Sequence, residues 1–211
     1  MNGYIEYEWE DKEENSHKYL FNQLQKMLDK KKNLKILDVG CGNGFLACKL
    51  IKMGFDIYGF DASEGGIKIA KSKHNERFFL QDITSKELPQ ELKNIKFDTI
   101  ISTEVIEHLY DPRGYIDLCK SILQKNGGGE LIISTPYHGY LKNLIWALIG
   151  ATDKHFTALW DCGHIKFWSF KTLDKLLEEF GFEIVEHKGA GRLPYLWKSM
   201  FVKSKIGKNN G

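Results

Sequence analysis

Apolar and polar positions along the chain form short runs that predict strands, separated by segments with helical spacing. The runs with the length of strands are residues 36–40, 56–60, 78–80, 97–102, 130–134, 182–186 and 199–204. Helical spacing covers residues 19–28, 45–53, 64–73, 111–123 and 172–180. This alternation predicts an α/β domain with a parallel sheet and helices on both faces. The connection between the last two runs is too short for a helical crossover, which predicts one antiparallel strand.

A glycine-rich turn follows the first apolar run. Gly40, Gly42 and Gly44 stand two residues apart, and Asp61 directly follows the second run. Glycines let a backbone turn sharply and approach a ligand closely, and an acid about 20 residues further on is placed to bind a ribose diol. The spacing is neither the Gly-x-Gly-x-x-Gly of dinucleotide sites nor a P-loop. The turn therefore predicts a nucleotide site of another kind.

A second group of polar side chains follows the fourth run. Glu104, Glu107 and His108 are spaced i, i+3 and i+4, so on a helical turn they would share one face. Two carboxylates and an imidazole are a metal-ligand set. The alternative is structural: the two acids stabilise a helix start through its dipole, and His108 is a packed side chain.

Outside the alternating core, the chain has two distinctive segments. Residues 1–33 form an N-terminal helical segment, in which Tyr4, Tyr7 and Trp9 are either lid residues or surface aromatics. Within a main domain of residues 34–206, an insertion at about 138–164 is apolar and carries tryptophans. It predicts a cover over an apolar substrate, a contact with a membrane surface, a subdomain core or a dimer contact. Residues 207–211 are a tail.

Composition narrows the class of protein only modestly. A chain of 211 residues predicts one domain. With 30 Lys+Arg against 28 Asp+Glu, the net charge is too small to create a positive electrostatic field that attracts nucleic acid. The four cysteines form no Cys-x-x-Cys pair, and no signal peptide is evident. These features predict a cytoplasmic protein with reduced thiols, with peripheral membrane contact left open. The longest apolar run, residues 144–151, is too short to span a bilayer.

The sequence Asp-Val-Gly-Cys-Gly-Asn-Gly at residues 38–44 resembles motif I of the class I S-adenosylmethionine-dependent methyltransferases. The resemblance extends over roughly residues 34–206. It implies a Rossmann-like, doubly wound, seven-stranded sheet of order 3-2-1-4-5-7-6 with strand 7 antiparallel. It also implies S-adenosylmethionine as cofactor and S-adenosylhomocysteine as product. The residues that it assigns to the cofactor are Asp38, Gly40, Cys41, Gly42, Asp61, Ala62, Asp82, Ile83 and Thr103.

Two of these assignments concern the adenine. The resemblance implies that Asp82 binds the adenine amino group and that the backbone of Ile83 reads the ring. The alternative for Asp82 is a turn-forming role. Cys41 is expected to be a small packing residue within the turn rather than a nucleophile.

The Glu-x-x-Glu-His stretch resembles two groups of enzymes, the ubiquinone-type O-methyltransferases and the small-RNA 3′-end 2′-O-methyltransferases. The second group holds Mg²⁺ with this stretch and a later histidine, here His164, with His138 and His155 as weaker candidates. The implied set for Mg²⁺ or another divalent cation is Glu104, Glu107, His108 and His164. The candidate catalytic residues are Glu107, His108 and His164; without a metal, His108 or His164 would be the general base.

These observations predict methyl transfer to a hydroxyl oxygen of a small quinol-like or lipophilic molecule. One alternative is an RNA 2′-O-methyltransferase. It is disfavoured because the chain is short, nearly neutral and has no recognisable RNA-binding module. The other alternative is a non-catalytic module that binds S-adenosylmethionine.

Overall fold

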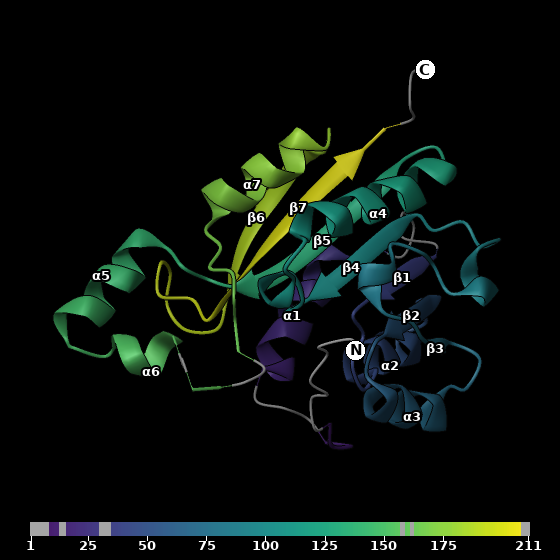
Figure 1. Ribbon diagram of the computed structural model, residues 1–211, viewed down its shortest axis with the longest axis horizontal. Coiled ribbons are helices and arrows are strands. Elements are labelled where there is room, and N and C mark those ends of the chain that lie inside the picture. The colour runs from purple at the N-terminus through teal and green to yellow at the C-terminus, as the bar shows by residue number, and fades with distance from the viewer. Residues whose placement is uncertain (1–8, 13–15, 30–34, 157–158, 161–162, 208–211) are drawn as a thin grey trace.

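The structure, a computed structural model, describes residues 9–12, 16–29, 35–156, 159–160 and 163–207 (Figure 1). Its described part contains one sheet of seven strands in the order β3-β2-β1-β4-β5-β7-β6. The strands are β1 (Ile36–Val39), β2 (Ile57–Asp61), β3 (Phe78–Leu80), β4 (Thr99–Thr103), β5 (Gly129–Pro136), β6 (Glu183–Ala190) and β7 (Ser199–Ile206). β7 runs antiparallel to both β5 and β6, and the other neighbouring pairs are parallel. The predicted fold and strand order are confirmed.

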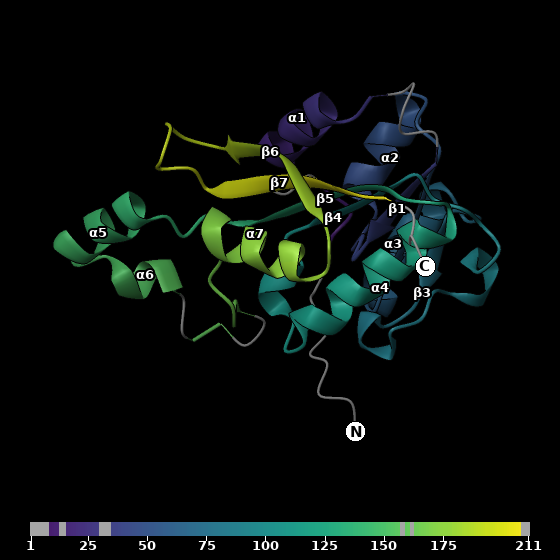
Figure 2. The same cartoon turned by 90° about the horizontal axis from the view of Figure 1, so that it is seen from above.

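Helices cover both faces of the sheet, as the alternating pattern predicts. α1 (His17–Met27) and α2 (Phe45–Lys52) lie on one side, and α4 (Pro112–Lys125) and α7 (Phe170–Glu179) lie on the other (Figure 2). α3 (Glu64–Lys73) shares the buried cluster of α1 and α2, whereas α4 and α7 share the opposite one. α5 (Tyr140–Leu148) and α6 (Thr152–Phe156) stand beyond one end of the sheet (Figure 1).

β1 is the centre of this arrangement because it pairs with β2 on one side and β4 on the other. Ile36 packs into the cluster on one face of the sheet, and Leu37 and Val39 pack into the cluster on the other. This alternation is the period of two that a strand imposes. At the end of β1, the Ser102 hydroxyl of β4 donates a hydrogen bond to the carbonyl of Val39 over 2.8 Å. The carboxyl ends of the two strands are therefore tied together.

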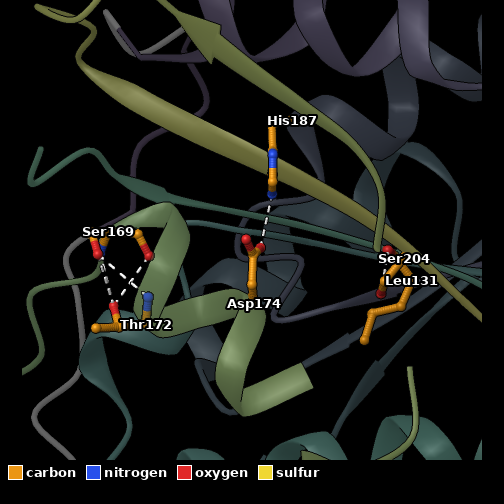
Figure 3. Close-up of polar contacts among 6 residues, drawn as sticks. All are labelled: Leu131, Ser169, Thr172, Asp174, His187 and Ser204. Atoms are coloured by element: carbon orange, nitrogen blue, oxygen red, sulfur yellow. Dashed lines mark hydrogen bonds and ion pairs between the residues drawn. The ribbon is translucent and has the colours of Figure 1, made fainter. Parts of the chain in front are cut away.

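α7 begins earlier than the apolar spacing predicts, at Phe170 rather than Thr172. The reason is a capping box, in which the Thr172 N–H donates to Ser169 Oγ and the Ser169 N–H donates to Thr172 Oγ1 (Figure 3). His187 Nε2 lies 2.8 Å from Asp174 Oδ1, which joins α7 to β6. On the neighbouring strands, the Ser204 hydroxyl donates to the carbonyl of Leu131 (Figure 3).

α5, in the apolar insertion, has the reverse of the usual amphipathic arrangement. Its buried residue is Lys142, which is 5% exposed, whereas Tyr140 is 83% and Leu148 is 77% exposed. Helices on a domain surface normally bury the apolar stripe instead. α5 itself therefore does not build a subdomain core among the described residues. The substrate-cover, membrane and dimer interpretations of the insertion stay predictions.

No helix in the described part of the chain has the length and apolar character needed to cross a bilayer.

The capping box gives a test of the α7 boundary. We expect Ser169→Ala to lower the free energy of unfolding by about 1 kcal/mol, because the Thr172 N–H loses its acceptor. Urea denaturation measures this change. The control is Ser72→Ala in α3, where the exposed hydroxyl bonds only to the carbonyl of Ile69. Equal stability of the Ser169 variant and the wild type would contradict the cap.

Candidate functional site

The glycine turn after β1 leaves no room for a side chain at Gly40 or Gly42. Gly40 and Gly42 both have positive φ, at 76° and 52°. A Cβ on Gly40 would lie 2.5 Å from a methyl of Val105, and one on Gly42 would lie 2.4 Å from the indole of Trp9. Both residues are glycine because the conformation and the close neighbours exclude a side chain.

Asp61, at the end of β2, is bound to this turn. Its Oδ2 accepts a hydrogen bond from Gly42 N, and its Oδ1 accepts one from Ser63 N, each over 2.8 Å. Burial raises the pKa of Asp61, and these N–H donors partly offset the rise. Ala62 follows directly, in the bend between β2 and α3. Each carboxylate oxygen has two lone pairs, so Asp61 can accept further hydrogen bonds from a ligand.

Asp38 is a buried carboxylate whose loss of hydration is only partly replaced by hydrogen bonds. Its side chain is 2% exposed, and Oδ1 has no hydrogen-bond partner among the described residues. Burial, together with the nearby charge of Asp61, raises the pKa of Asp38 to about 8. An acceptor in such a position is unfavourable unless a ligand donates to it.

Trp9 connects the N-terminal segment with the turn. A Cβ on Gly42 would lie 2.4 Å from its indole, and one on Gly66 would lie 3.0 Å from it. The Asn43 side-chain amide donates to the carbonyl of Glu10 over 2.9 Å, and Lys73 forms an ion pair with Asp11. Trp9 is therefore placed against the candidate nucleotide site, as a lid residue would be. Tyr4 and Tyr7 lie outside the described residues.

The remaining predicted cofactor residues lie around the same sheet edge. Thr103 ends β4, and Ile83 packs partly against the core. Asp82 Oδ1 accepts a hydrogen bond from Thr84 N, which is the turn-forming role. Its predicted contact with adenine stays a prediction. Burial raises the pKa of the Cys41 thiol well above its ordinary value, which suits the packing role and disfavours a thiolate nucleophile.

Glu104 does not share a helical face with Glu107 and His108. Only residues 106–108 form a short 3₁₀ turn, and Glu104 precedes it with φ at 55°. Its carboxylate accepts hydrogen bonds from the hydroxyls of Ser134, over 2.8 Å, and Ser199, over 3.2 Å. Burial raises the pKa of Glu104 to about 7 even so. Glu104 thus bonds to β5 and β7, and it is not part of the group of possible ligand atoms that Glu107, His108 and His164 form.

Glu107, His108 and His164 do come together. One potential ligand atom from each lies within 4.8 Å of the others, and the His108 and His164 rings are 5.0 Å apart. The backbone holds this arrangement, because the N–H groups of Ile165 and Lys166 both donate to the carbonyl of Glu107.

Glu107 is the unusual member of this cluster. Its side chain is 0% exposed, and neither carboxylate oxygen has a hydrogen-bond partner among the described residues. Burial first, and then the charge of Glu104, raise the pKa of Glu107 well above its ordinary value, and the nearby Thr135 hydroxyl only partly offsets the rise. His108 Nε2 lies 4.0 Å from Glu107 Oε1. A proton or a cation would complete such a cluster.

Two cavities of about 400 Å³ each adjoin this edge of the sheet. One cavity is lined by Glu104 and His164, together with residues of α1, α5, the end of β5 and the start of β7. His138 lines it as well, whereas the side chain of His155 lies outside the described part. The other is mostly apolar and lies between α5 and the loop that joins β6 to β7. Cavities of this size suit small molecules.

Sequence reasoning missed several residues of this site. Tyr19 of α1 and Arg192 of the β6–β7 loop line the cavity, and Ser134 and Ser199 hold Glu104. No local pattern indicates them, since segments far apart in the chain supply them. Lys142 was detectable, because it is a lone charge in an apolar helical run.

The sequence matches a known protein family and several curated proteins. The family model described as "Methyltransferase domain" matches residues 12–187. A ubiquinone biosynthesis O-methyltransferase of Dinoroseobacter shibae is 34% identical over 164 residues, which cover 75% of this chain and 63% of the relative. A protein of the same name from Roseobacter denitrificans is 32% identical over 173 residues, covering 79% and 66%. The chain thus spans slightly less than two thirds of the length of these curated relatives.

Solved structures share the fold. A magnesium protoporphyrin IX methyltransferase from Synechocystis PCC 6803, solved with bound S-adenosylhomocysteine, matches 91% of this chain with a TM-score of 0.66 and 21% identity. The match covers 84% of that structure. Since the family match spans most of the sequence, including the glycine turn and the acidic turn after β4, the protein belongs to the methyltransferase domain family.

Proposed function

We propose that the protein transfers a methyl group from S-adenosylmethionine to a hydroxyl oxygen of a small quinol-like or lipophilic acceptor. The observation that carries the proposal is the contact between the two halves of the site. Val105 packs against Gly40 of the nucleotide turn and directly precedes the 3₁₀ turn that carries Glu107 and His108. The nucleotide turn and the acid–histidine cluster are thus neighbours at one sheet edge, where open α/β sheets bind ligands.

The residues around the glycine turn fit this cofactor. Gly40 and Gly42 allow a close backbone approach, and the remaining lone pairs of Asp61 suit the two hydroxyls of a ribose. The unpartnered Oδ1 of Asp38 suits the ammonium of an amino acid. When bound, S-adenosylmethionine supplies a methyl group that its sulfonium already activates. The protein then needs to position the acceptor and take its proton.

His108 and His164 are the residues suited to accept the proton of the acceptor hydroxyl. His164 lines the cavity, and the His108 ring lies 5.0 Å from the His164 ring. A neutral imidazole accepts a proton near neutral pH. A divalent cation is the alternative, with Glu107, His108 and His164 as its ligands, and it would lower the pKa of the acceptor hydroxyl. The unpartnered oxygens of Glu107 fit a cation. Glu104 is not included, because the group of possible ligand atoms within 4.8 Å of one another consists of Glu107, His108 and His164.

The cavity supports a small molecule as the acceptor. Its volume of about 400 Å³ suits a compact substrate, and the mostly apolar neighbouring cavity suits a lipophilic group. The names of the curated relatives are consistent with an oxygen acceptor. Membrane contact remains a prediction that rests on the outward apolar side chains of α5.

Cofactor binding is tested with Asp61→Ala. In isothermal titration with S-adenosylmethionine, we expect the dissociation constant to rise at least about tenfold, because hydrogen bonds to the ribose are lost. Asp117→Ala, on the exposed side of α4, is the control and should titrate like the wild type. A wild type that does not bind, or an Asp61 variant with unchanged affinity, would sink the cofactor assignment.

Asp38→Asn tests whether the Asp38 carboxylate serves cofactor binding at the expense of the stability of the fold. The folded-state pKa of Asp38 is raised to about 8, so its contribution to stability is present at low pH and is lost as pH rises through about 8. At pH 8, the cofactor-free variant should therefore unfold at a higher temperature than the wild type, by about 2–4 °C for each kcal/mol recovered. The variant should also bind S-adenosylmethionine more weakly.

The measurements for Asp38→Asn are thermal unfolding at pH 5 and pH 8, and titration of the cofactor. Equal melting temperatures at both pH values, together with equal affinity, would contradict the role of the orphaned carboxylate.

The choice between a base and a cation is tested with Glu107→Gln. If a cation is held, Mn²⁺ binding followed by electron paramagnetic resonance should weaken at least about a hundredfold, because a charged ligand becomes a neutral amide. Affinity for S-adenosylmethionine should stay within twofold. Glu178→Gln, exposed on α7, is the control. Undiminished Mn²⁺ binding by the Glu107 variant would exclude this metal site and leave the histidines as bases.

A further inference from the structure

Three cations surround the cavity that Glu104 and His164 line, which we call the acceptor cavity. They come from three different segments of the chain. Lys142 belongs to α5, Arg192 to the β6–β7 loop, and Lys198 directly precedes β7. Against them stands one acid, Glu104, whose pKa burial raises to about 7. Among the described residues, no carboxylate lies within ion-pair distance of any of the three cations. The cavity therefore has a surplus of positive charge.

Lys142 shows that this surplus is built into the interior. Its side chain is only 5% exposed, and its ammonium donates to the carbonyl of Tyr137 over 2.7 Å. An ammonium has three protons to donate, so this bond leaves further donors for a ligand. Burial and the nearby charge of Arg192 lower the pKa of Lys142 to about 8, and the charge of Glu104 only partly offsets them. A buried cation next to another cation is unfavourable unless an anion joins them.

The two other cations lie on the solvent side, each beside an aromatic ring. The guanidinium of Arg192 lies 5.7 Å from the Trp146 ring, and Lys198 Nζ lies 5.3 Å from the Tyr19 ring. The Lys198 N–H donates to the carbonyls of Ala190 and Gly191, which closes the base of the β6–β7 loop. The exposed cations are thus positioned around the cavity that Lys142 enters.

An apolar compartment adjoins the cations directly. The second cavity is lined by Ile145, Trp146, Leu193 and Leu196 together with Lys142 and Arg192, which both cavities share. A molecule that spans the two compartments would place an apolar group among the first four residues. It would then bring an anionic group to Lys142 and Arg192.

We propose that the acceptor site binds an amphipathic molecule in which an oxyanion, either a carboxylate, a phosphate or a sulfonate, is attached to an apolar body. Lys142 and Arg192 hold the oxyanion, and the α5 and β6–β7 loop side chains hold the apolar body. This inference rests on the proposed function for the identity of the molecule as methyl acceptor. The competing interpretation is that Lys142 merely supports the carbonyl of Tyr137.

Two fluorescent dyes that differ only in charge distinguish these interpretations. 1-Anilinonaphthalene-8-sulfonate carries a sulfonate, and N-phenyl-1-naphthylamine is the same molecule without it. Both are titrated into the purified full chain and into Lys142→Met, Arg192→Met and Lys125→Met. Lys125 is exposed in α4, on the far side of the sheet from α1, and serves as the matched control.

We expect the anionic dye to bind about tenfold more weakly to the Lys142 and Arg192 variants, because each loses a charged hydrogen-bond donor. Binding of the neutral dye should stay within twofold in every protein, and Lys125→Met should match the wild type. Equal binding of the anionic dye to all four proteins would overturn the proposal, and so would an equal loss of both dyes. If thermal unfolding shows that Lys142→Met does not fold, Arg192→Met in the exposed loop decides the result.

Titration of the same proteins with S-adenosylmethionine separates this inference from the proposed function. Cofactor binding without charge selectivity between the dyes removes the anion site and leaves the proposed function. Charge selectivity without cofactor binding by the wild type supports the anion site and removes the proposed function.

Discussion

The position of β1 between β2 and β4 is the constraint on which the rest of the site depends. Parallel neighbours bring their carboxyl ends to one edge. The glycine turn after β1, Asp61 at the end of β2 and the turn of residues 104–108 after β4 must therefore meet there. Each of these segments lies within a few residues of a buried strand. Their relative positions are therefore held by the core rather than by the ligands they are proposed to bind.

Around this edge the protein keeps charged groups that the fold alone does not satisfy. Asp38 and Glu107 are buried carboxylates with unpartnered oxygens among the described residues, and Lys142 is a buried ammonium beside Arg192. Each raises the free energy of the folded, ligand-free protein, because burial disfavours the charged form. Groups of this kind cluster at functional sites, where a ligand supplies the missing partner. In the proposed function, Asp38 lies at the cofactor site and Glu107 lies near the acceptor hydroxyl. Lys142 lies where the proposed anionic group of the acceptor would bind.

α5 illustrates the same principle at the level of a helix. A helix that only needed to pack would bury its leucines, yet α5 buries Lys142 and exposes Leu148. This orientation is explained if the helix serves the cavity on one side. On its other side, the exposed apolar face is where the proposed membrane contact would form.

The sequence by itself determined the alternation of strands and helices, the glycine turn and the positions of Asp38 and Asp61, because period and spacing are local properties that the core enforces. The strand order followed from the resemblance to the methyltransferases, since no local pattern specifies which strands are neighbours. The resemblance in sequence also predicted that His164 lies with Glu107 and His108. It did not separate Glu104 from them, since Glu104 bonds to Ser134 and Ser199, which are 30 and 95 residues further on. Only the tertiary structure brought Trp9 onto Gly42 and gathered Lys142, Arg192 and Lys198 around one cavity. Contacts between segments so far apart leave no periodicity in the chain, and for that reason the acceptor site is visible only in three dimensions.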